Sequence, residues 1–293
     1  MSTPRTLTFL LYDHIGGVDT LLYCLSNASC IVTVPDRLPD TVCAAVETFG
    51  VEVLPVSPSF LNLLILGQAY KRHDLRSLRF ITYGAEVMPE STLRKCHELF
   101  PHVQMLQKFG TTEVGTLRSR SRASDSTWVK IGGGGYAVRV VDGILQIKAR
   151  SAILGYLNAP SPFTDDGWFI TGDLAEEDGE YLRILGRKTD VINVDGEKVN
   201  PAEVEGVIYE IDGIHEVSVY GESNPILGQI LCAQISLAVS ATNSQSFIQR
   251  VKAHCAARLE RYKIPVRVTT VEGVLHTDRF KTMRRQWVGE GTT

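Results

Sequence analysis

The first 117 residues alternate short apolar runs with segments of helical spacing, and this alternation restricts the fold more than any other feature. Strands that alternate with helices in this way form right-handed βαβ units around a parallel sheet. We therefore predict a partial α/β subdomain over residues 1–118. The expected strands lie at 29–34, 51–56, 79–83 and 103–108, and the expected helices between them lie at 38–49, 57–70 and 89–100.

The pattern changes after Glu113, where short strand-like segments are separated by glycine turns up to Leu185. Asp-Gly pairs at 142–143, 166–167 and 178–179 are typical of β-hairpins, and they predict a small antiparallel β module over residues 119–186. From residue 187 to 293 the pattern mixes strands with helices. That length suits a compact, mobile α+β lid domain at the C-terminus.

Composition excludes several classes of function. The 293 residues carry a formal net charge of −3, so no basic surplus predicts a nucleic-acid partner or an anionic membrane surface. We interpret the short basic cluster of Arg279, Arg284 and Arg285 as a solvated face. No apolar stretch approaches the roughly 20 residues of a membrane-spanning helix, and we expect no secretory signal. The six cysteines lack metal-site spacing, which favours reduced thiols and the cytoplasm.

A polar segment, Phe109-Gly110-Thr111-Thr112-Glu113, follows the last predicted strand of the parallel sheet. Open α/β sheets bind ligands at the carboxyl ends of their strands, where a glycine lets the backbone turn tightly. Threonine hydroxyls can bind phosphate oxygens, and the carboxylate of Glu113 can hold Mg²⁺, which prefers oxygen ligands. The alternative is an ordinary polar loop with a helix-capping threonine.

Three further polar residues have the chemistry of a nucleotide site. Asp173, in Thr171-Gly172-Asp173, can accept hydrogen bonds from ribose hydroxyls. Arg187 offers a planar fork of donors for ribose or phosphate oxygens. Lys281 can neutralise charge while an acyl-phosphate bond forms. The alternatives are a turn-stabilising aspartate, a basic linker and a solvated lysine.

The order of these segments resembles that of the adenylate-forming enzymes, the superfamily of acyl-CoA synthetases, firefly luciferase and nonribosomal peptide adenylation domains. The resemblance covers nearly the whole chain, and its most specific pieces are TGDL and GRKTDVINVDGEKVNPAEVE. It implies activation of a carboxylic acid as acyl-AMP and transfer of the acyl group to a thiol. The matching segments are YDHIGG at 12–17, YGAE at 83–86, FGTTE at 109–113, IKARSAILGY at 147–156, WFITGDL at 168–174, GRKTDVINVDGEKVNPAEVE at 186–205, and Lys281.

The resemblance also implies a binding role for each matched residue around ATP or AMP. Gly84, Ala85 and Glu86 would line the adenine slot, and Asp173 and Arg187 would bind the ribose hydroxyls. The phosphate side would be formed by Phe109, Gly110, Thr111 and Thr112, with Glu113 as the Mg²⁺ ligand.

Catalysis and domain motion are implied for a second group of residues. Lys281 would contact the carboxylate and α-phosphate during adenylation, and His14 would gate the acyl pocket. Lys188 and Thr189 match the hinge about which the C-terminal domain rotates. Gly196, in the Asp195-Gly196 turn, would line the tunnel for pantetheine, from CoA or from an acyl carrier protein.

Two departures from the family pattern bear on activity. Only thirteen residues precede His14, and residues 1–11 contain no glycine- and hydroxyl-rich loop of the kind that grips the β- and γ-phosphates of ATP. Its loss would remove backbone donors from the polyphosphate. In addition, Phe280 stands where the family has a glycine before the terminal lysine.

We therefore hypothesise an acid–thiol ligase that is impaired alone or dependent on a partner. The missing half could lie on a complementing N-terminal chain, the protein could have specialised in thioester transfer, or it could be a truncated remnant. The rival hypothesis is a non-catalytic module that binds a nucleotide or acyl-adenylate, or docks a carrier protein. The sequence identifies neither the acid nor the thiol.

Overall fold

The computed structural model describes residues 3–224, 228–237, 245–278 and 280–284. The chain divides into two compact units, Met1–Lys188 and Thr189–Thr293, which we call the N-terminal and C-terminal units. The predicted fold class is confirmed, because the chain combines a parallel sheet, antiparallel sheets and an α+β C-terminal unit. The finer boundaries at residues 118 and 186 stay predictions.

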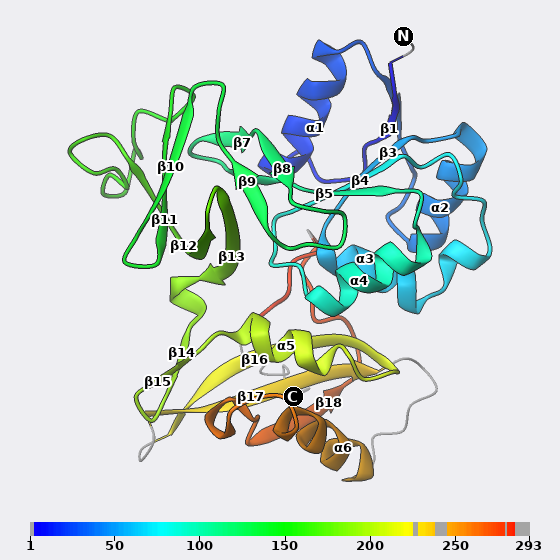
Figure 1. Cartoon of the computed structure of the whole chain (residues 1–293). Helices are drawn as coiled ribbons and strands as arrows, with labels where there is room; N and C mark the ends of the chain where they lie inside the picture. The colour runs from blue at the N-terminus through cyan, green and yellow to red at the C-terminus, as the bar shows by residue number, and fades with distance from the viewer. Residues whose placement is uncertain (1–2, 225–227, 238–244, 279, 285–293) are drawn as a thin grey trace, which may run out of the picture. The chain divides into compact units, whose positions relative to one another are not determined.

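A five-stranded parallel sheet forms the first layer of the N-terminal unit, with strand order β2-β1-β3-β4-β5. Figure 1 shows α1 on one face of this sheet and α3 and α4 on the other. The strands are Arg5–Leu7 (β1), Cys30–Val32 (β2), Val53–Val56 (β3), Phe80–Tyr83 (β4) and Gln104–Gln107 (β5), and the helices are Ile15–Ser26 (α1), Pro39–Phe49 (α2), Pro58–Leu66 (α3), Glu90–Leu99 (α4) and the short turn Ala69–Lys71 (η1).

Local sequence signals explain where these helices begin and end. Ser57 caps α3 by accepting a hydrogen bond from Phe60 N at 3.1 Å, and Pro58 occupies the first turn, where its missing N–H is harmless. Gly50 ends α2 in the left-handed conformation, with φ of 58°. Helix α1 and strand β1 lie outside the predicted elements.

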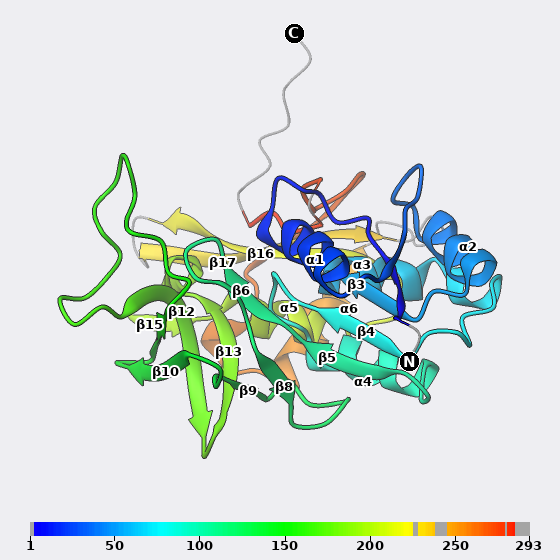
Figure 2. The same cartoon turned by 90° about the horizontal axis from the view of Figure 1, so that it is seen from above.

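Antiparallel strands form the second layer of the N-terminal unit. A six-stranded sheet has the order β10-β11-β12-β13-β9-β8, and β6 pairs with β7. Figure 2 shows this sheet beside β5, which contacts β8. Its core includes Val129, Leu145 and Phe169. The strands are Phe109–Thr111 (β6), Gly115–Leu117 (β7), Ser119–Ser121 (β8), Val129–Ile131 (β9), Tyr136–Val141 (β10), Ile144–Ala149 (β11), Phe169–Asp178 (β12) and Tyr181–Arg187 (β13), followed by the turn Lys188–Asp190 (η2).

The C-terminal unit packs two helices on a five-stranded sheet. Its strand order is β15-β14-β17-β16, and β18 pairs with β17 in parallel. Buried residues such as Val199, Val204 and Leu231 form its core. The elements are Ile192–Val194 (β14), Glu197–Val199 (β15), Pro201–Ile208 (α5), Ile214–Asn224 (β16), Gly228–Leu237 (β17), Gln245–Ala256 (α6), Arg261–Lys263 (η3) and Arg267–Val271 (β18).

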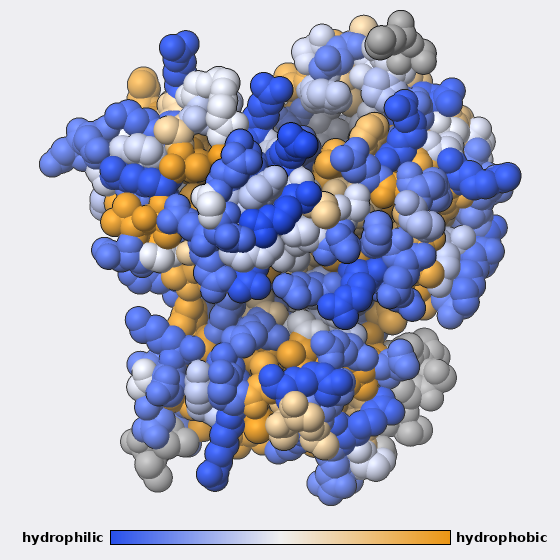
Figure 3. Space-filling model, viewed as in Figure 1, coloured by the Kyte–Doolittle hydropathy of each residue, from blue (hydrophilic) through white to orange (hydrophobic). Residues whose placement is uncertain are grey.

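The surface in Figure 3 is mostly hydrophilic, with apolar residues in separate patches. None of the helices within the described residues has both the length and the apolarity needed to cross a bilayer.

Candidate functional site

The segment after β4 is held tightly against the end of β5. Lys108 N donates to Tyr83 O at 2.7 Å, and a Cβ on Gly84 would lie 2.6 Å from Lys108 O. No residue larger than glycine fits this crossing without moving the backbone. Ala85 has a left-handed φ of 70°. The proposed adenine segment is therefore rigidly placed at a strand end.

The carboxylate of Glu86 binds the start of α3. Its Oε2 accepts hydrogen bonds from Ser59 N at 3.1 Å and from Ser59 Oγ at 2.7 Å. A carboxylate at a helix N-terminus satisfies backbone donors that have no partner within the helix. Glu86 thus fixes the loop in place, which fits an adenine slot formed mainly by backbone.

The predicted phosphate segment forms a tight hairpin between β6 and β7. A Cβ on Gly110 would meet Thr116 Cα at 2.8 Å, so this position also requires glycine. Phe109 packs against the antiparallel core. Thr112 is exposed, whereas Thr111 Oγ1 is buried and lies near enough to the Glu113 carboxylate to lower its pKa.

Glu113, the predicted metal ligand, accepts a hydrogen bond from the hydroxyl of Tyr156 at 2.6 Å. Burial raises the pKa of Glu113, but the bond from Tyr156, the nearby Thr111 hydroxyl and the charge of Arg187 together lower it overall. The same bond raises the pKa of Tyr156. Glu113 is therefore held as a carboxylate.

Asp173 and Arg187 face each other across the β12–β13 ladder. Arg187 Nε lies 2.9 Å from Asp173 Oδ1, and Arg187 Nη1 donates to Thr171 O at 2.6 Å. Asp173 is nearly buried, with 10% of its side chain exposed, while 53% of the Arg187 side chain is exposed. Thr171 Oγ1 also accepts from Asp173 N at 2.9 Å. A fixed carboxylate and an accessible guanidinium are suited to bind the hydroxyls of a sugar.

These pairs are neighbours within the N-terminal unit. The charge of Arg187 contributes to the low pKa of Glu113 and acts on Tyr156 as well. The structure thus brings together four predicted residues, Thr111, Glu113, Asp173 and Arg187. It adds Tyr156, to which the sequence analysis gave no role, although it closes the matched segment IKARSAILGY.

His14 forms the N-cap of α1. Its Nδ1 accepts a hydrogen bond from Gly16 N at 3.2 Å, and α1 contacts β6 and β7. The His14 ring therefore caps a helix that contacts the hairpin carrying Thr111. Its predicted role as an acyl-pocket gate stays a prediction.

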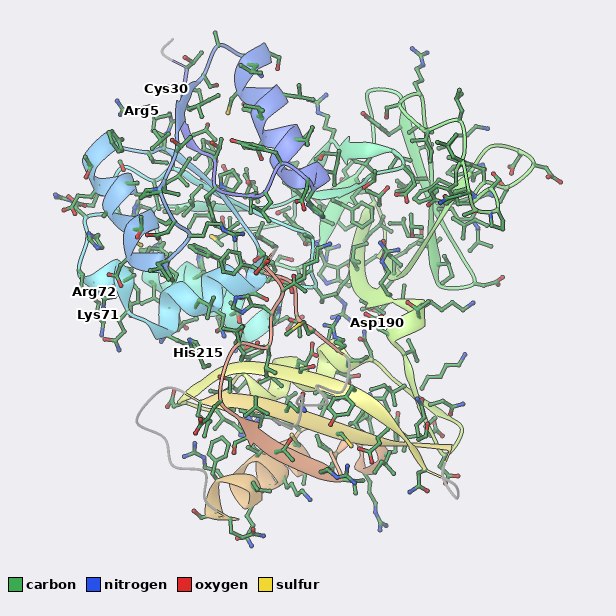
Figure 4. The ribbon with its side chains drawn as sticks, turned by 180° about the vertical axis from the view of Figure 1, so that it is seen from behind. Arg5, Cys30, Lys71, Arg72, Asp190 and His215 are labelled. Carbon is green, nitrogen blue, oxygen red and sulfur yellow. The ribbon has the colours of Figure 1, made fainter. Side chains whose placement is uncertain are left out.

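The boundary between the two units falls between Lys188 and Thr189, the two residues predicted as the hinge. Asp190, labelled in Figure 4, follows them in η2 and lies 3.2 Å from Arg284 Nη1. Gly196 occupies the β14–β15 turn with a φ of 88°, and nothing crowds its Cβ position. The turn is open, as a pantetheine-lining role requires.

Lys281 lies in a short hairpin of the C-terminal unit, spanning residues 275–283. Met283 N donates to Leu275 O at 2.8 Å, and Thr277 N donates to Lys281 O at 2.9 Å. His276 and Thr282 form an isolated antiparallel bridge. The backbone that carries the predicted catalytic lysine is thus ordered by its own hydrogen bonds.

Comparison with known proteins decides the family. A model of the AMP-binding enzymes matches residues 1–145, and a model of the AMP-binding enzyme C-terminal domain matches residues 203–281. The chain belongs to the AMP-binding enzyme family. The predicted resemblance to adenylate-forming enzymes is therefore confirmed.

The curated relatives of this chain include CoA ligases. The indoleacetate–CoA ligase of Aromatoleum aromaticum is 28% identical over 312 residues, which cover 98% of this chain and 60% of the ligase. A long-chain-fatty-acid–CoA ligase of Mycobacterium tuberculosis is 28% identical, covering 96% of this chain and 58% of that protein. The chain thus spans about three fifths of the length of these relatives.

A solved structure confirms the fold of the chain. The anthranilate CoA ligase crystallised with anthranoyl-AMP superposes with a TM-score of 0.84 at 22% identity. The match covers 97% of this chain and 58% of the ligase.

Proposed function

We propose that this chain belongs to an acid–thiol ligase that activates a carboxylic acid as acyl-AMP and transfers the acyl group to a phosphopantetheine thiol. The observation that carries the proposal is the cluster of Asp173–Arg187 and Glu113–Tyr156 beside the buried Thr111 hydroxyl. The CoA-ligase names of the relatives support the same chemistry.

The N-terminal unit would bind the nucleotide by its sugar and its α-phosphate. Asp173 would accept hydrogen bonds from the ribose hydroxyls while Arg187 donates to them. Thr111 and the exposed Thr112 would donate to phosphate oxygens from the β6–β7 hairpin. Gly84 and Ala85 would present backbone to the adenine ring.

Glu113 suits Mg²⁺ because its lowered pKa keeps it ionised at neutral pH. No cluster of three or more metal-binding side chains occurs within residues 3–224, 228–237, 245–278 and 280–284. A single carboxylate nevertheless fits Mg²⁺, which keeps several waters and binds substrate phosphates in such sites. When bound, the ion would neutralise charge on the phosphates. Tyr156 would orient the Glu113 carboxylate.

Lys281 would act in the first half-reaction. The substrate carboxylate attacks the α-phosphorus of ATP, pyrophosphate leaves, and negative charge accumulates on the phosphoryl oxygens. A lysine ammonium placed there stabilises that charge more in the transition state than in the ground state.

The second half-reaction would use a different face of the C-terminal unit. The C-terminal unit would rotate about Lys188 and Thr189, an ordinary hinge motion. The rotation would remove Lys281 from the acyl-adenylate and bring the Gly196 turn to it. The thiol of CoA or of an acyl carrier protein would then attack the acyl carbonyl and release AMP. The unit boundary at the predicted hinge supports this step.

The relatives are longer by about two fifths of their length, and we propose that the activity needs a lobe of that kind. Helix α1 exposes Leu22, Tyr23 and Leu25 in its outer turns. Adjacent exposed apolar side chains on one helix are typical of a surface that another segment covers. An N-terminal lobe, on the same polypeptide or on a separate chain, would cover α1 and supply the phosphate loop.

Acid-dependent pyrophosphate exchange tests the proposal. The chain would be assayed with a panel of aryl and aliphatic acids, alone and with the part of the indoleacetate–CoA ligase that this chain does not match, supplied as a separate chain. We expect exchange with the added lobe and abolition by Lys281→Ala. Lys252→Ala, on α6, is the matched control.

Thioester formation from supplied acyl-AMP separates the two half-reactions. We expect Lys281→Ala to retain transfer to CoA or to a carrier protein. Equal loss in both half-reactions would contradict the role of Lys281. AMP binding without exchange, even with the added lobe, would instead favour a non-catalytic nucleotide-binding module.

A further inference from the structure

The Lys281 hairpin is attached to the sheet by a buried carboxylate. Glu216, on β16, has only 5% of its surface exposed. Its Oε2 accepts a hydrogen bond from Leu275 N at 2.6 Å, and its Oε1 is paired with Nδ1 of His276. A buried carboxylate is costly unless both oxygens have partners. Here both oxygens bind the first strand of the hairpin.

The residue before Lys281 adds a second restraint. Phe280 has a left-handed φ of 53°. This backbone conformation is unfavourable for residues other than glycine. Its ring is nevertheless buried and stacks on His276, with ring centroids 5.0 Å apart and planes inclined by 22°. This chain therefore combines an unfavourable backbone conformation with a ring contact that holds it.

Two serines bind the backbone at the last residue of this hairpin and two residues before its first. Ser218 Oγ, on β16, donates to Met283 O, and Ser236 Oγ, on β17, donates to Gly273 O at 2.9 Å. The sheet therefore holds the backbone on both sides of Lys281, and His276 and Phe280 contact each other between these points.

We propose that Glu216, His276 and Phe280 form a clamp that holds the backbone of Lys281 in one conformation. Glu216 fixes the imidazole of His276, the imidazole supports the Phe280 ring, and the ring fixes the residue next to Lys281. These three are positioning residues that act through Lys281. Their effect on catalysis rests on the adenylation role proposed for Lys281, whereas the clamp itself does not.

Limited trypsin proteolysis of the full chain tests the clamp without relying on activity. Cleavage after Lys281 requires local opening, and its rate follows the population of the open form. Phe280→Ala loses the stacked ring, and the rate of cleavage after Lys281 should rise up to about tenfold. Mass spectrometry of the released fragment would measure this rate. Phe280→Tyr keeps the ring and should cleave as slowly as the parent chain.

Phe280→Gly separates the ring from the backbone conformation. Glycine adopts the left-handed φ without strain but has no ring. The clamp predicts accelerated cleavage in both the glycine and the alanine variant, and also in His276→Ala. A glycine variant as protected as the parent would overturn the clamp, because backbone conformation alone would then explain the order. A midpoint temperature of thermal unfolding equal to that of the parent chain would show that each variant keeps its fold.

The catalytic consequence has a separate readout. Phe280→Ala and Phe280→Gly should lower kcat of adenylation up to about tenfold, with an unchanged KM for ATP and unchanged thioester transfer. Accelerated cleavage with unaltered kcat would remove the positioning role. If Lys281→Ala itself keeps full adenylation, the proposed function fails, while the proteolysis result still decides whether the clamp exists.

Discussion

Tyr156 donates its hydroxyl to Glu113 Oε1 over 2.6 Å, although the two residues are 43 positions apart in the sequence. One belongs to the hairpin after the parallel sheet, and the other follows β11 of the antiparallel sheet. The bond therefore joins the β6–β7 hairpin to the segment after β11 at the proposed metal ligand. It also ties the ionisation of Glu113 to the folded state.

Tyr156→Phe should destabilise the chain at pH 7 by about 1 kcal/mol, the usual net value of one hydrogen bond. The folded pKa of Glu113 is lowered, so this contribution is present above the ordinary value of about 4.3 and is lost as pH falls through the folded pKa. Urea unfolding at pH 7 and at pH 3 would measure it. Tyr181→Phe, whose ring contacts Arg122, is the control.

Arg187→Ala should destabilise the chain more than an ordinary surface pair does. Asp173 is nearly buried and would lose its cation, which is expected to cost about 1–3 kcal/mol after allowance for the exposure of Arg187. Lys130→Ala breaks the exposed Lys130–Glu180 pair of the same sheet and should cost less than about 1 kcal/mol. Equal unfolding free energies for the two variants would refute the structural importance of Asp173–Arg187.

Glu205→Ala should destabilise the C-terminal unit strongly. Glu205 is buried, accepts from Val219 N at 3.0 Å, and pairs with Arg284 at 2.7 Å. Removing one partner of such a pair is expected to cost about 3–5 kcal/mol. Glu203→Ala is the matched control, because Lys263 keeps Glu260 as a second partner. Chemical denaturation followed by circular dichroism would compare them.

Thiol chemistry should distinguish Cys30 from the other five cysteines. Cys30 is exposed on the edge strand β2, as Figure 4 shows, and the others are buried. Burial raises the pKa of Cys43 and Cys96 to about 12 and that of Cys255 to about 11. A disulfide reagent at pH 8 should modify one thiol per native chain and six after denaturation, and Cys30→Ser should abolish the fast phase.

The same raised pKa values predict weaker folding at alkaline pH. Between the ordinary thiol pKa of about 9 and the folded values, the unfolded chain binds fewer protons than the native chain, so stability falls as pH rises. Urea midpoints at pH 8 and pH 10 would show the decline. Replacing Cys43 with Ala should reduce its slope.

The alternating pattern was enough to predict most of the parallel sheet. Helix α3 began where Ser57-Pro58 indicated, but it ended at Leu66 rather than at residue 70, since Gly67 interrupts the spacing. Helix α1 was not predicted, because Gly16 and Gly17 are poor helix formers. A Cβ at Gly17 would lie 2.2 Å from Leu11 O, so the tight turn that enters the helix explains that glycine.

For the candidate site, residue chemistry predicted the participants but not their pairing. Asp173 and Arg187 were each expected to bind ribose, yet their mutual ion pair depends on the register of β12 and β13. Tyr156 had no signal beyond its place in a matched segment, since its contact with Glu113 is long-range. The support of Phe280 by His276 and Glu216 likewise required coordinates.

The crossing of Gly84 and Lys108 has a consequence for ligand dimensions. Because no carbon atom can be inserted there, the loop proposed to face adenine and the loop proposed to face the phosphates cannot move independently. The distance between the two loops is therefore fixed. A ligand that contacts both loops must have a length that matches this distance. Enlarging the gap would require both strand ends to shift together.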